Sequence, residues 1–234
     1  MATYVCSDIH GLSEKYFELL RRIDLENQDR LIILGDVIDR GPDGFTILKD
    51  VLSRNNVQLL MGNHEYMMLE VLEANNGNIP NDYMILFNWI LNGGIPTMEA
   101  YKKADQKDKD FVFRSLKELP FAYTDLVINE RHFYLCHSAP GPAKEKAILY
   151  RNDIEDALHF VWDRMDPERS LLEGKTIVAG HTIVKNYHYD LTVYCDTGDL
   201  KTARYIDIDC GCAMNDETSR LACLCLDTME VNYF

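Results

Sequence analysis

Polar side chains that can bind metal follow several short apolar runs of this sequence, each where the run ends. Asp8 and His10 come directly after the run at 3–6, and they lie two positions apart. On an extended backbone, residues i and i+2 point the same way, so both side chains should face one site. The same placement recurs after four further apolar runs, which are followed by Asp36, Asn63, His137 and His181.

Carboxylate, amide and imidazole ligands in this mixture suit Mn, Fe, Zn or Co better than an all-oxygen Ca or Mg site. These ligands are too many for one closed tetrahedral ion, but they suffice for two ions that share a bridging carboxylate. Two cations ~3.5–4 Å apart can hold a phosphate and activate an attacking water. A single histidine in an apolar run is more often a packed core residue, whereas this repeated placement favours a dinuclear site, with Mn as the expected metal.

Several motifs extend this set along the chain. They are DIHG at 8–11, GDVIDRG at 35–41, GNHE at 62–65, the later His137, WDR at 162–164 and GHT at 180–182. Together they resemble the phosphoprotein phosphatase family of calcineurin-like metallophosphoesterases. The similarity is greatest to compact bacterial and phage serine/threonine phosphatases and to bacterial diadenosine tetraphosphate hydrolases. One such motif is weak evidence, but the set follows the family's order and covers almost the whole chain.

The resemblance implies a role for each matching residue. The first metal would be bound by Asp8, His10 and Asp36, and Asp36 would bridge to a second metal completed by Asn63, His137 and His181. His64 would be the general acid that protonates the leaving oxygen, with Asp39 as its partner. Arg40 and Arg164 would hold the phosphate oxygens together with Asn63, because a guanidinium presents two parallel donors to phosphate.

Other interpretations exist for some of these residues. Asp39 and Arg40 could pair only with each other, and Glu65 could serve as a cap for the helix that follows it, since acids favour helix N-termini. Two positions depart from the family pattern. Ser7 stands where glycine is more usual, and Ser138-Ala139 follows His137. Neither departure removes a ligand, but both change residues next to the predicted metal ligands, where the surroundings tune the metal.

The elements that must position these residues follow from periodicity. In the first third of the chain, short apolar runs alternate with helical spacing around 12–23, 45–52 and 67–72, which predicts βαβ units with parallel strands. Residues from about 75 to 120 predict a helical insertion, and short strands after Pro120 predict a second, partly antiparallel sheet. Together with the resemblance, this favours a single α/β domain over 1–234, a four-layer α/β/β/α sandwich with two mixed sheets.

Composition narrows the class of protein. The chain has 234 residues, 47% of them hydrophobic, and a formal net charge of −14. This charge disfavours nucleic acid and anionic membranes as partners. No membrane span or signal peptide is visible, and seven cysteines are an odd count, so we expect reduced thiols and a cytoplasmic location. Cys210, Cys212, Cys223 and Cys225 could ligate zinc, but buried packing is the favoured interpretation.

The leading functional hypothesis is a metal-dependent serine/threonine protein phosphatase that acts on a phosphoprotein or phosphopeptide. The alternative is a bis(5'-nucleosyl)-tetraphosphatase, which shares every motif, and a non-catalytic binding scaffold is a remote third. A dinucleoside polyphosphate should require extra cations, and the sequence offers no second cationic cluster beyond the two arginines. Aromatic residues of the insertion could stack on bases, although helix packing is the favoured role; they are Tyr83, Phe87, Trp89 and Tyr101.

Overall fold

The strands of the protein form two mixed sheets. The computed structural model describes residues 1–141, 146–167, 171–188, 190–214 and 217–234, without the side chains of 83 and 85. The strands are β1 (Thr3–Cys6), β2 (Arg30–Ile33), β3 (Val57–Leu59), β4 (Ala122–Ile128), β5 (Arg131–Cys136), β6 (Ile148–Leu149), β7 (Thr176–Ala179), β8 (Tyr194–Cys195), β9 (Tyr205–Asp207), β10 (Ala222–Cys225) and β11 (Glu230–Tyr233).

Each sheet combines three neighbouring parallel strands with antiparallel strands, which lie along one edge of the first sheet and along both edges of the second. The first sheet has the order β11-β10-β1-β2-β3, in which β1, β2 and β3 are parallel and the two C-terminal strands are antiparallel. The second sheet has the order β6-β4-β5-β7-β9-β8, with β5, β7 and β9 parallel. Both sheets therefore have a set of neighbouring strands whose carboxyl ends lie at one edge, where sites of open α/β sheets are built.

The two sheets are joined by a shared apolar core. Val5 and Ile32 of the first sheet belong to the same buried cluster as Phe133, Leu135 and Val178 of the second. Their neighbours along the strands point the other way, as the period of two requires. Leu31 and Ile33 thus pack in the cluster that includes helix residues of the first layer.

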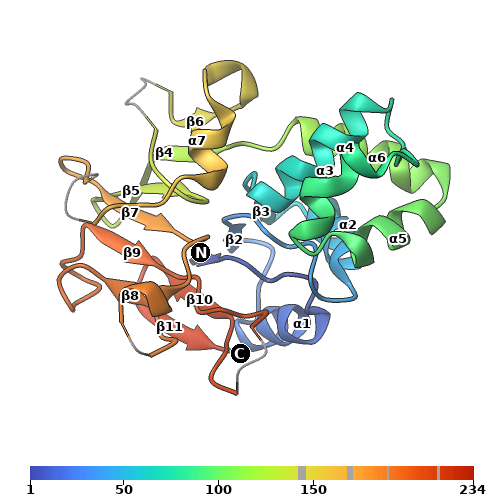
Figure 1. Cartoon of the computed structure of the whole chain (residues 1–234). Coiled ribbons are helices and arrows are strands. Elements are labelled where there is room, and N and C mark those ends of the chain that lie inside the picture. The colour runs from blue at the N-terminus through green and yellow to red at the C-terminus, as the bar shows by residue number, and fades with distance from the viewer. Residues whose placement is uncertain (142–145, 168–170, 189, 215–216) are drawn as a thin grey trace.

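Helices cover the outer faces of this pair of sheets. Figure 1 shows α4, α5 and α6 grouped beside α2 and α3, on the side away from β4–β9. On the second sheet, Phe160 of α7 belongs to the same cluster as Tyr134 and Ile177. The helices are α1 (Ser13–Arg22), α2 (Gly44–Ser53), α3 (Asn63–Ala74), α4 (Tyr83–Leu91), α5 (Ile95–Lys103), α6 (Gln106–Lys117) and α7 (Ala157–Trp162), with 3-10 turns η1 (Arg151–Asp153) and η2 (Val184–Asn186).

The structure confirms the predicted fold class, two mixed sheets between helices. Helices α4–α6 occupy the segment predicted as a helical insertion, and side-chain caps begin two of them. Asp82 accepts the N–H of Met84 at the start of α4, and Asp105 accepts that of Asp108 at the start of α6. The sequence prediction did not include the two-residue strand β6 or helix α7, because such short elements carry too little periodicity to detect.

The cysteines fit the packing interpretation. Cys210, Cys212, Cys223 and Cys225 are buried, and Cys223 lies opposite Cys6 in the register of β10 and β1. Among the described residues, the side-chain groups with metal-ligand spacing contain no cysteine. In the same part of the chain, no helix has the length and apolar character that crossing a membrane demands.

Candidate active site

The predicted ligands gather at one edge of the molecule, immediately after five of the parallel strands. The turns there are tight, and several of the residues have a left-handed backbone although they are not glycine. This group comprises Asp8 (φ 55°), His10 (φ 48°), Asp36 (φ 59°), Asp39 (φ 70°), Arg40 (φ 63°) and His181 (φ 65°). Such conformations cost of order 1–3 kcal/mol each and concentrate at functional sites.

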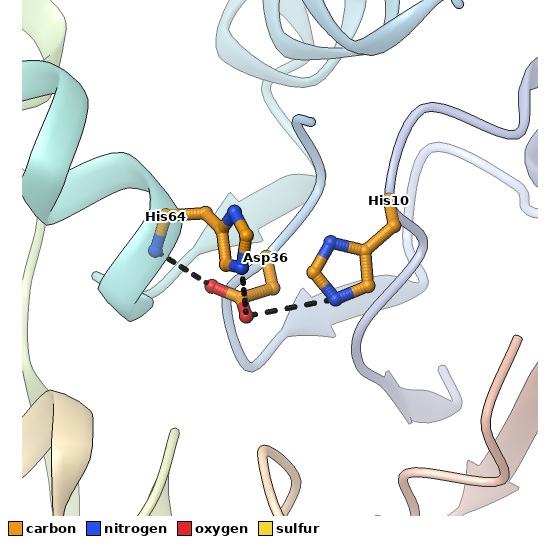
Figure 2. A group of neighbouring side chains, drawn as sticks. All are labelled: His10, Asp36 and His64. Carbon is orange, nitrogen blue, oxygen red and sulfur yellow. Dashed lines mark hydrogen bonds and ion pairs between the residues drawn. The ribbon is translucent and has the colours of Figure 1, made fainter. Parts of the chain in front are cut away.

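Asp36 lies at the centre of the site and is 1% exposed. Its Oδ2 atom is 3.7 Å from His10 Nε2, 3.8 Å from His64 Nε2 and 3.5 Å from His137 Nε2. Figure 2 shows His10 and His64 on either side of the Asp36 carboxylate. Asp8 joins them, with Oδ1 3.7 Å from His10 Nε2. The central position of one carboxylate oxygen is what a bridging ligand between two cations requires.

A second set of donors lies on the other side of Asp36. Asn63 Oδ1 is 2.9 Å from His137 Nε2 and 3.1 Å from His181 Nδ1. His137 donates its Nδ1–H to the Leu34 carbonyl at 2.7 Å, so its Nε2 offers a lone pair toward the Asn63 oxygen. His10 is oriented in the same way, because its Nδ1–H donates to the Ile38 carbonyl at 3.1 Å. A cation bound here would be coordinated by the lone pairs of Asn63 Oδ1 and of the facing imidazole nitrogens, and the hydrogen bonds to the backbone carbonyls would orient those imidazoles.

The electrostatics of the site also fit divalent cations. Burial lowers the pKa of His10 and of His137, and burial next to His137 and Arg164 lowers the pKa of His181 to about 2. These imidazoles are therefore neutral and free to coordinate. Burial raises the pKa of Asp36, whose ionised form a cation would favour. Donor atoms within 4.8 Å of one another form two groups, His10–Asp36–His64 and Asp36–His137–His181.

His64 belongs to one of these groups, but its surroundings favour proton transfer over coordination. Its Nδ1–H donates to Asp39 Oδ2 at 2.7 Å, and both residues are completely buried. Arg40 Nη2 donates to His64 Nε2 at 3.3 Å. A permanent cation so close to Nε2 disfavours a metal ion at that atom. The His64–Asp39 pair that the resemblance implies is thus present as a hydrogen bond.

A cavity of about 190 Å³ opens onto the ligands. Arg40 and Arg164 both line it, and Arg164 Nη1 donates to Thr182 Oγ1 at 3.1 Å. The remaining wall combines one ring, one branched apolar side chain, two amides and a further acid; these residues are Trp162, Ile183, Asn92, Asn186 and Asp209. The structure therefore brings all ten predicted site residues to one edge, most of them at this cavity.

Several residues around the site were not predicted, or were left open. Glu65 accepts the backbone N–H groups of Gly62, Asp36 and Val37, so it caps α3 and fixes the Asp36 turn at once. Ser7 Oγ donates to Asp8 Oδ2 at 2.5 Å, and the backbone N–H of His181 donates to the same atom at 3.0 Å. The unusual serine thus orients a ligand.

Asp209 is the clearest omission. It follows β9 as the other acids and imidazoles follow their strands, so the same placement after an apolar run could have identified it. It is 4% exposed and lines the cavity, and burial together with Asp8 raises its pKa. Close packing explains the glycines that precede the ligands. A Cβ on Gly62 would collide with Asp36 Oδ1, and one on Gly180 with Ser7 Oγ and Asp8 Oδ2.

Solved structures share this fold at low sequence identity. A crystal structure of a candidate diadenosine tetraphosphatase matches all of this chain and 92% of its own, with a TM-score of 0.63 and 16% identity. A serine/threonine protein phosphatase of Saccharomyces cerevisiae matches all of this chain and 79% of its own, with a TM-score of 0.62 and 15% identity. At these identities the likeness concerns the fold alone.

Sequence relatives point to a family. A symmetrical bis(5'-nucleosyl)-tetraphosphatase of Proteus mirabilis is 36% identical over 115 residues, which are 44% of this chain and 42% of the relative. One from Enterobacter sp. is 30% identical over 144 residues, or 61% of this chain and 44% of the relative. The matches thus span less than half of these relatives. The family model for calcineurin-like phosphoesterases matches residues 1–197. Given this match and the paired donor groups at the strand ends, the chain belongs to the calcineurin-like phosphoesterase family.

Proposed function

We propose that this phosphoesterase hydrolyses bis(5'-nucleosyl) tetraphosphates with the aid of two divalent cations, Mn being the expected metal. One observation carries the proposal. Arg40, Arg164 and the ring of Trp162 line the same cavity, which opens onto the Asp36 carboxylate. Two guanidinium groups suit a phosphate, and an aromatic ring at its side suits a nucleobase. The bacterial relatives named symmetrical bis(5'-nucleosyl)-tetraphosphatase support the same substrate class.

The cations would be held by Asp8, His10 and Asp36 on one side and by Asp36, Asn63, His137 and His181 on the other. When bound, they supply Lewis-acid polarisation of the phosphate and lower the pKa of an attacking water. The chain's own residues do the rest. Arg40 and Arg164 bind the non-bridging oxygens with Asn63 and hold the phosphorus in line for attack.

Proton transfer is assigned to His64. For this role His64 first takes up a proton from solvent at Nε2. As the water oxygen bonds to phosphorus and releases its proton to solvent, the bond to the leaving oxygen breaks and that oxygen takes the proton from His64 Nε2. Asp39 keeps the imidazole oriented through Nδ1. Arg40, which donates to Nε2 in this structure, must move toward the phosphate before Nε2 can act. Symmetrical cleavage of a dinucleoside tetraphosphate would release two nucleoside diphosphates.

A phosphoserine or phosphothreonine peptide is the second candidate substrate. Arg40 and Arg164 are the cationic residues of the described cavity lining, which is enough for one phosphoryl group but few for a tetraphosphate chain. Asp209 adds a negative charge to the same wall. Of the aromatic residues considered for base stacking, Trp89 and Tyr101 are buried, which leaves Phe87 exposed on α4; the Tyr83 side chain lies outside the described residues. We also propose that the chain forms a single domain and that it acts on its substrate in the cytoplasm.

The two substrates can be separated by one comparison. We expect the kcat/KM on diadenosine tetraphosphate to exceed that on a phosphoserine peptide by a hundredfold or more, at saturating Mn. Trp162→Ala should lower the kcat/KM for the dinucleotide about tenfold and leave that for the peptide within twofold, because base stacking is worth ~1–3 kcal/mol. Metal content should be measured in parallel, since Trp162 contacts His181 edge-on at 6.0 Å between ring centroids. A higher kcat/KM on the peptide would assign the second candidate.

A further inference from the structure

The helical insertion contacts the segment that contains Asp39, the partner of the general acid, and Arg40, one of the two phosphate-binding arginines. Three hydrogen bonds join them. Trp89 Nε1–H donates to Asp39 Oδ2 at 2.7 Å, the backbone N–H of Asp39 donates to Thr97 Oγ1 at 2.9 Å, and that of Arg40 donates to the Gly93 carbonyl at 3.0 Å. Since Asp39 and Arg40 both have a left-handed backbone, these contacts hold a conformation that the local chain would not favour.

The contact with Trp89 helps to orient the Asp39 carboxylate. Its Oδ2 atom accepts from two ring N–H groups, His64 Nδ1 and Trp89 Nε1, each at 2.7 Å. Within the described residues, its Oδ1 atom is buried and has no hydrogen-bond partner. With both donors on one oxygen, the carboxylate cannot rotate without losing two charge-assisted hydrogen bonds. With His64 as the one donor, partial rotation of the carboxylate would strain a single hydrogen bond, and the imidazole could tilt with it.

Trp89 itself is held rigidly. Its side chain is 1% exposed, and its ring packs so closely on Gly94 that a Cβ there would collide with the indole. The backbone N–H of Gly94 donates to the Trp89 carbonyl at 2.9 Å. The packing against Gly94 and the backbone hydrogen bond thus fix the position of the indole N–H independently of its contact with Asp39.

We propose that Trp89 is a positioning residue for the general acid. Its indole N–H holds the Asp39 carboxylate in the orientation that accepts from His64 Nδ1, and thereby aims His64 Nε2 at the leaving oxygen. This inference rests on the proposed function of His64. Trp89 lies on α4, within the helical insertion, so that part of the chain contributes to proton transfer as well as to packing.

The test is Trp89→Phe in the full chain with Mn, on two substrates that differ in leaving group. A phosphoserine peptide releases an alkoxide that needs a proton, whereas 4-nitrophenyl phosphate releases an oxygen that departs readily without one. We expect kcat on the peptide to fall about tenfold, the size of one charge-assisted hydrogen bond, and kcat on the aryl phosphate to stay within twofold. Equal losses on both substrates, or no loss on either, would overturn the proposal.

Two variants separate this inference from its foundation. His64→Asn should lower the alkyl rate by ~10²–10⁴; if it does not, the general acid itself is misassigned. If His64→Asn behaves as expected and Trp89→Phe is neutral, the positioning role alone is refuted. Adding Trp89→Phe to Asp39→Asn should cost nothing further on the alkyl substrate, because both act through one carboxylate.

Tyr101→Phe is the matched control for loosening of the insertion. Tyr101 is buried in α5 and donates to the Gly77 carbonyl at 2.6 Å, far along the chain from Asp39. It should leave the ratio of the two rates unchanged. If Trp89→Phe does not fold, the NMR resonance of the Trp89 indole N–H in the wild type tests the contact with Asp39 instead. The chain has two tryptophans, so Trp162→Phe assigns the signal. Asp39→Asn should shift it, and an unmoved resonance would refute the contact.

Discussion

Glu65 accepts the backbone N–H of Asp36 through Oε2 at 2.7 Å, across 29 positions of the chain, while its Oε1 accepts the N–H of Val37 at 2.9 Å. The left-handed turn that places Asp36 between the two donor groups is therefore fixed by a completely buried carboxylate. A residue that caps a helix thus also sets the geometry of the central ligand.

Replacing Glu65 should consequently affect stability and metal affinity together. Glu65→Gln keeps the size but replaces one acceptor oxygen by a donor, so a backbone N–H loses its partner. We expect a loss of about 2 kcal/mol in the free energy of unfolding and about tenfold weaker Mn binding. Urea unfolding of the metal-free protein and a Mn titration measure the two. Glu118→Gln, on the exposed end of α6, is the control and should change neither.

The donor set predicts two ions per chain. A chelator should abolish activity, added Mn should restore it, and metal analysis should find two Mn per chain at saturation. Asp36→Asn should reduce this number to one or none, because the shared Oδ2 ligand becomes neutral. Saturation of the wild type at one ion would contradict the dinuclear site.

Ser7 should tune the first of these ions. Its hydroxyl donates to Asp8 Oδ2 at 2.5 Å, which leaves Oδ1 facing His10. Ser7→Gly removes this donor, and hydrogen bonds to ligands are typically worth 10- to 100-fold in metal affinity. We expect about tenfold weaker binding of one ion and an unchanged second. Calorimetric Mn titration reports both sites, and Ser7→Thr, which retains a hydroxyl, should recover part of the affinity. Wild-type affinity in Ser7→Gly would show that the hydroxyl is dispensable.

The two cavity arginines should matter through their shape as well as their charge. Lysine keeps the charge of Arg40 or Arg164 but cannot offer two parallel donors. We expect each Arg→Lys variant to lower kcat/KM by about 10- to 100-fold, as the loss of a bidentate charged contact does, with metal content unchanged. Arg114→Lys on the exposed face of α6 is the control. A lysine variant at wild-type kcat/KM would remove that residue from phosphate binding.

The neutral imidazole of His181 should make the metal-free protein sensitive to acid. Its pKa is about 2 when folded and about 6.5 in an unfolded chain. The unfolded state therefore binds the extra proton, so this contribution to stability is present above pH 6.5 and is lost as the pH falls below it. Between pH 7.5 and 5.5, the wild type should lose on the order of 1 kcal/mol more than His181→Asn. Parallel curves for the two proteins would contradict the assignment.

The ligands were predictable from sequence because a local rule locates them. Apolar runs mark the buried strands, and a polar residue directly after such a run stands at the edge where parallel strands end. Asp8, Asp36 and His137 all obey this rule, and the structure places them together. The rule extends to Asp209 after β9, which the sequence prediction did not include.

The support around the ligands was not predictable in the same way. Trp89 contacts Asp39 across 50 positions of the chain, and nothing in its helical spacing distinguishes it from a core residue. The hydrogen bonds that Glu65 accepts from Asp36 and Val37 could not be predicted for the same reason. A helix cap can be predicted from residues that are neighbours in the sequence. Hydrogen bonds to the N–H groups of a distant loop depend on tertiary packing, which the local sequence does not show.

The position of the site between two sheets has a consequence for assembly. Asp8, His10 and Asp36 all follow strands of the first sheet, whereas His137 and His181 follow strands of the second. The first set of ligands comes from the initial third of the chain. The second set comes into existence only when the two sheets dock. An ion bound there would link Asp36 to His137 and His181, which lie more than a hundred residues further along the chain. Its release would therefore weaken the contact between the two sheets.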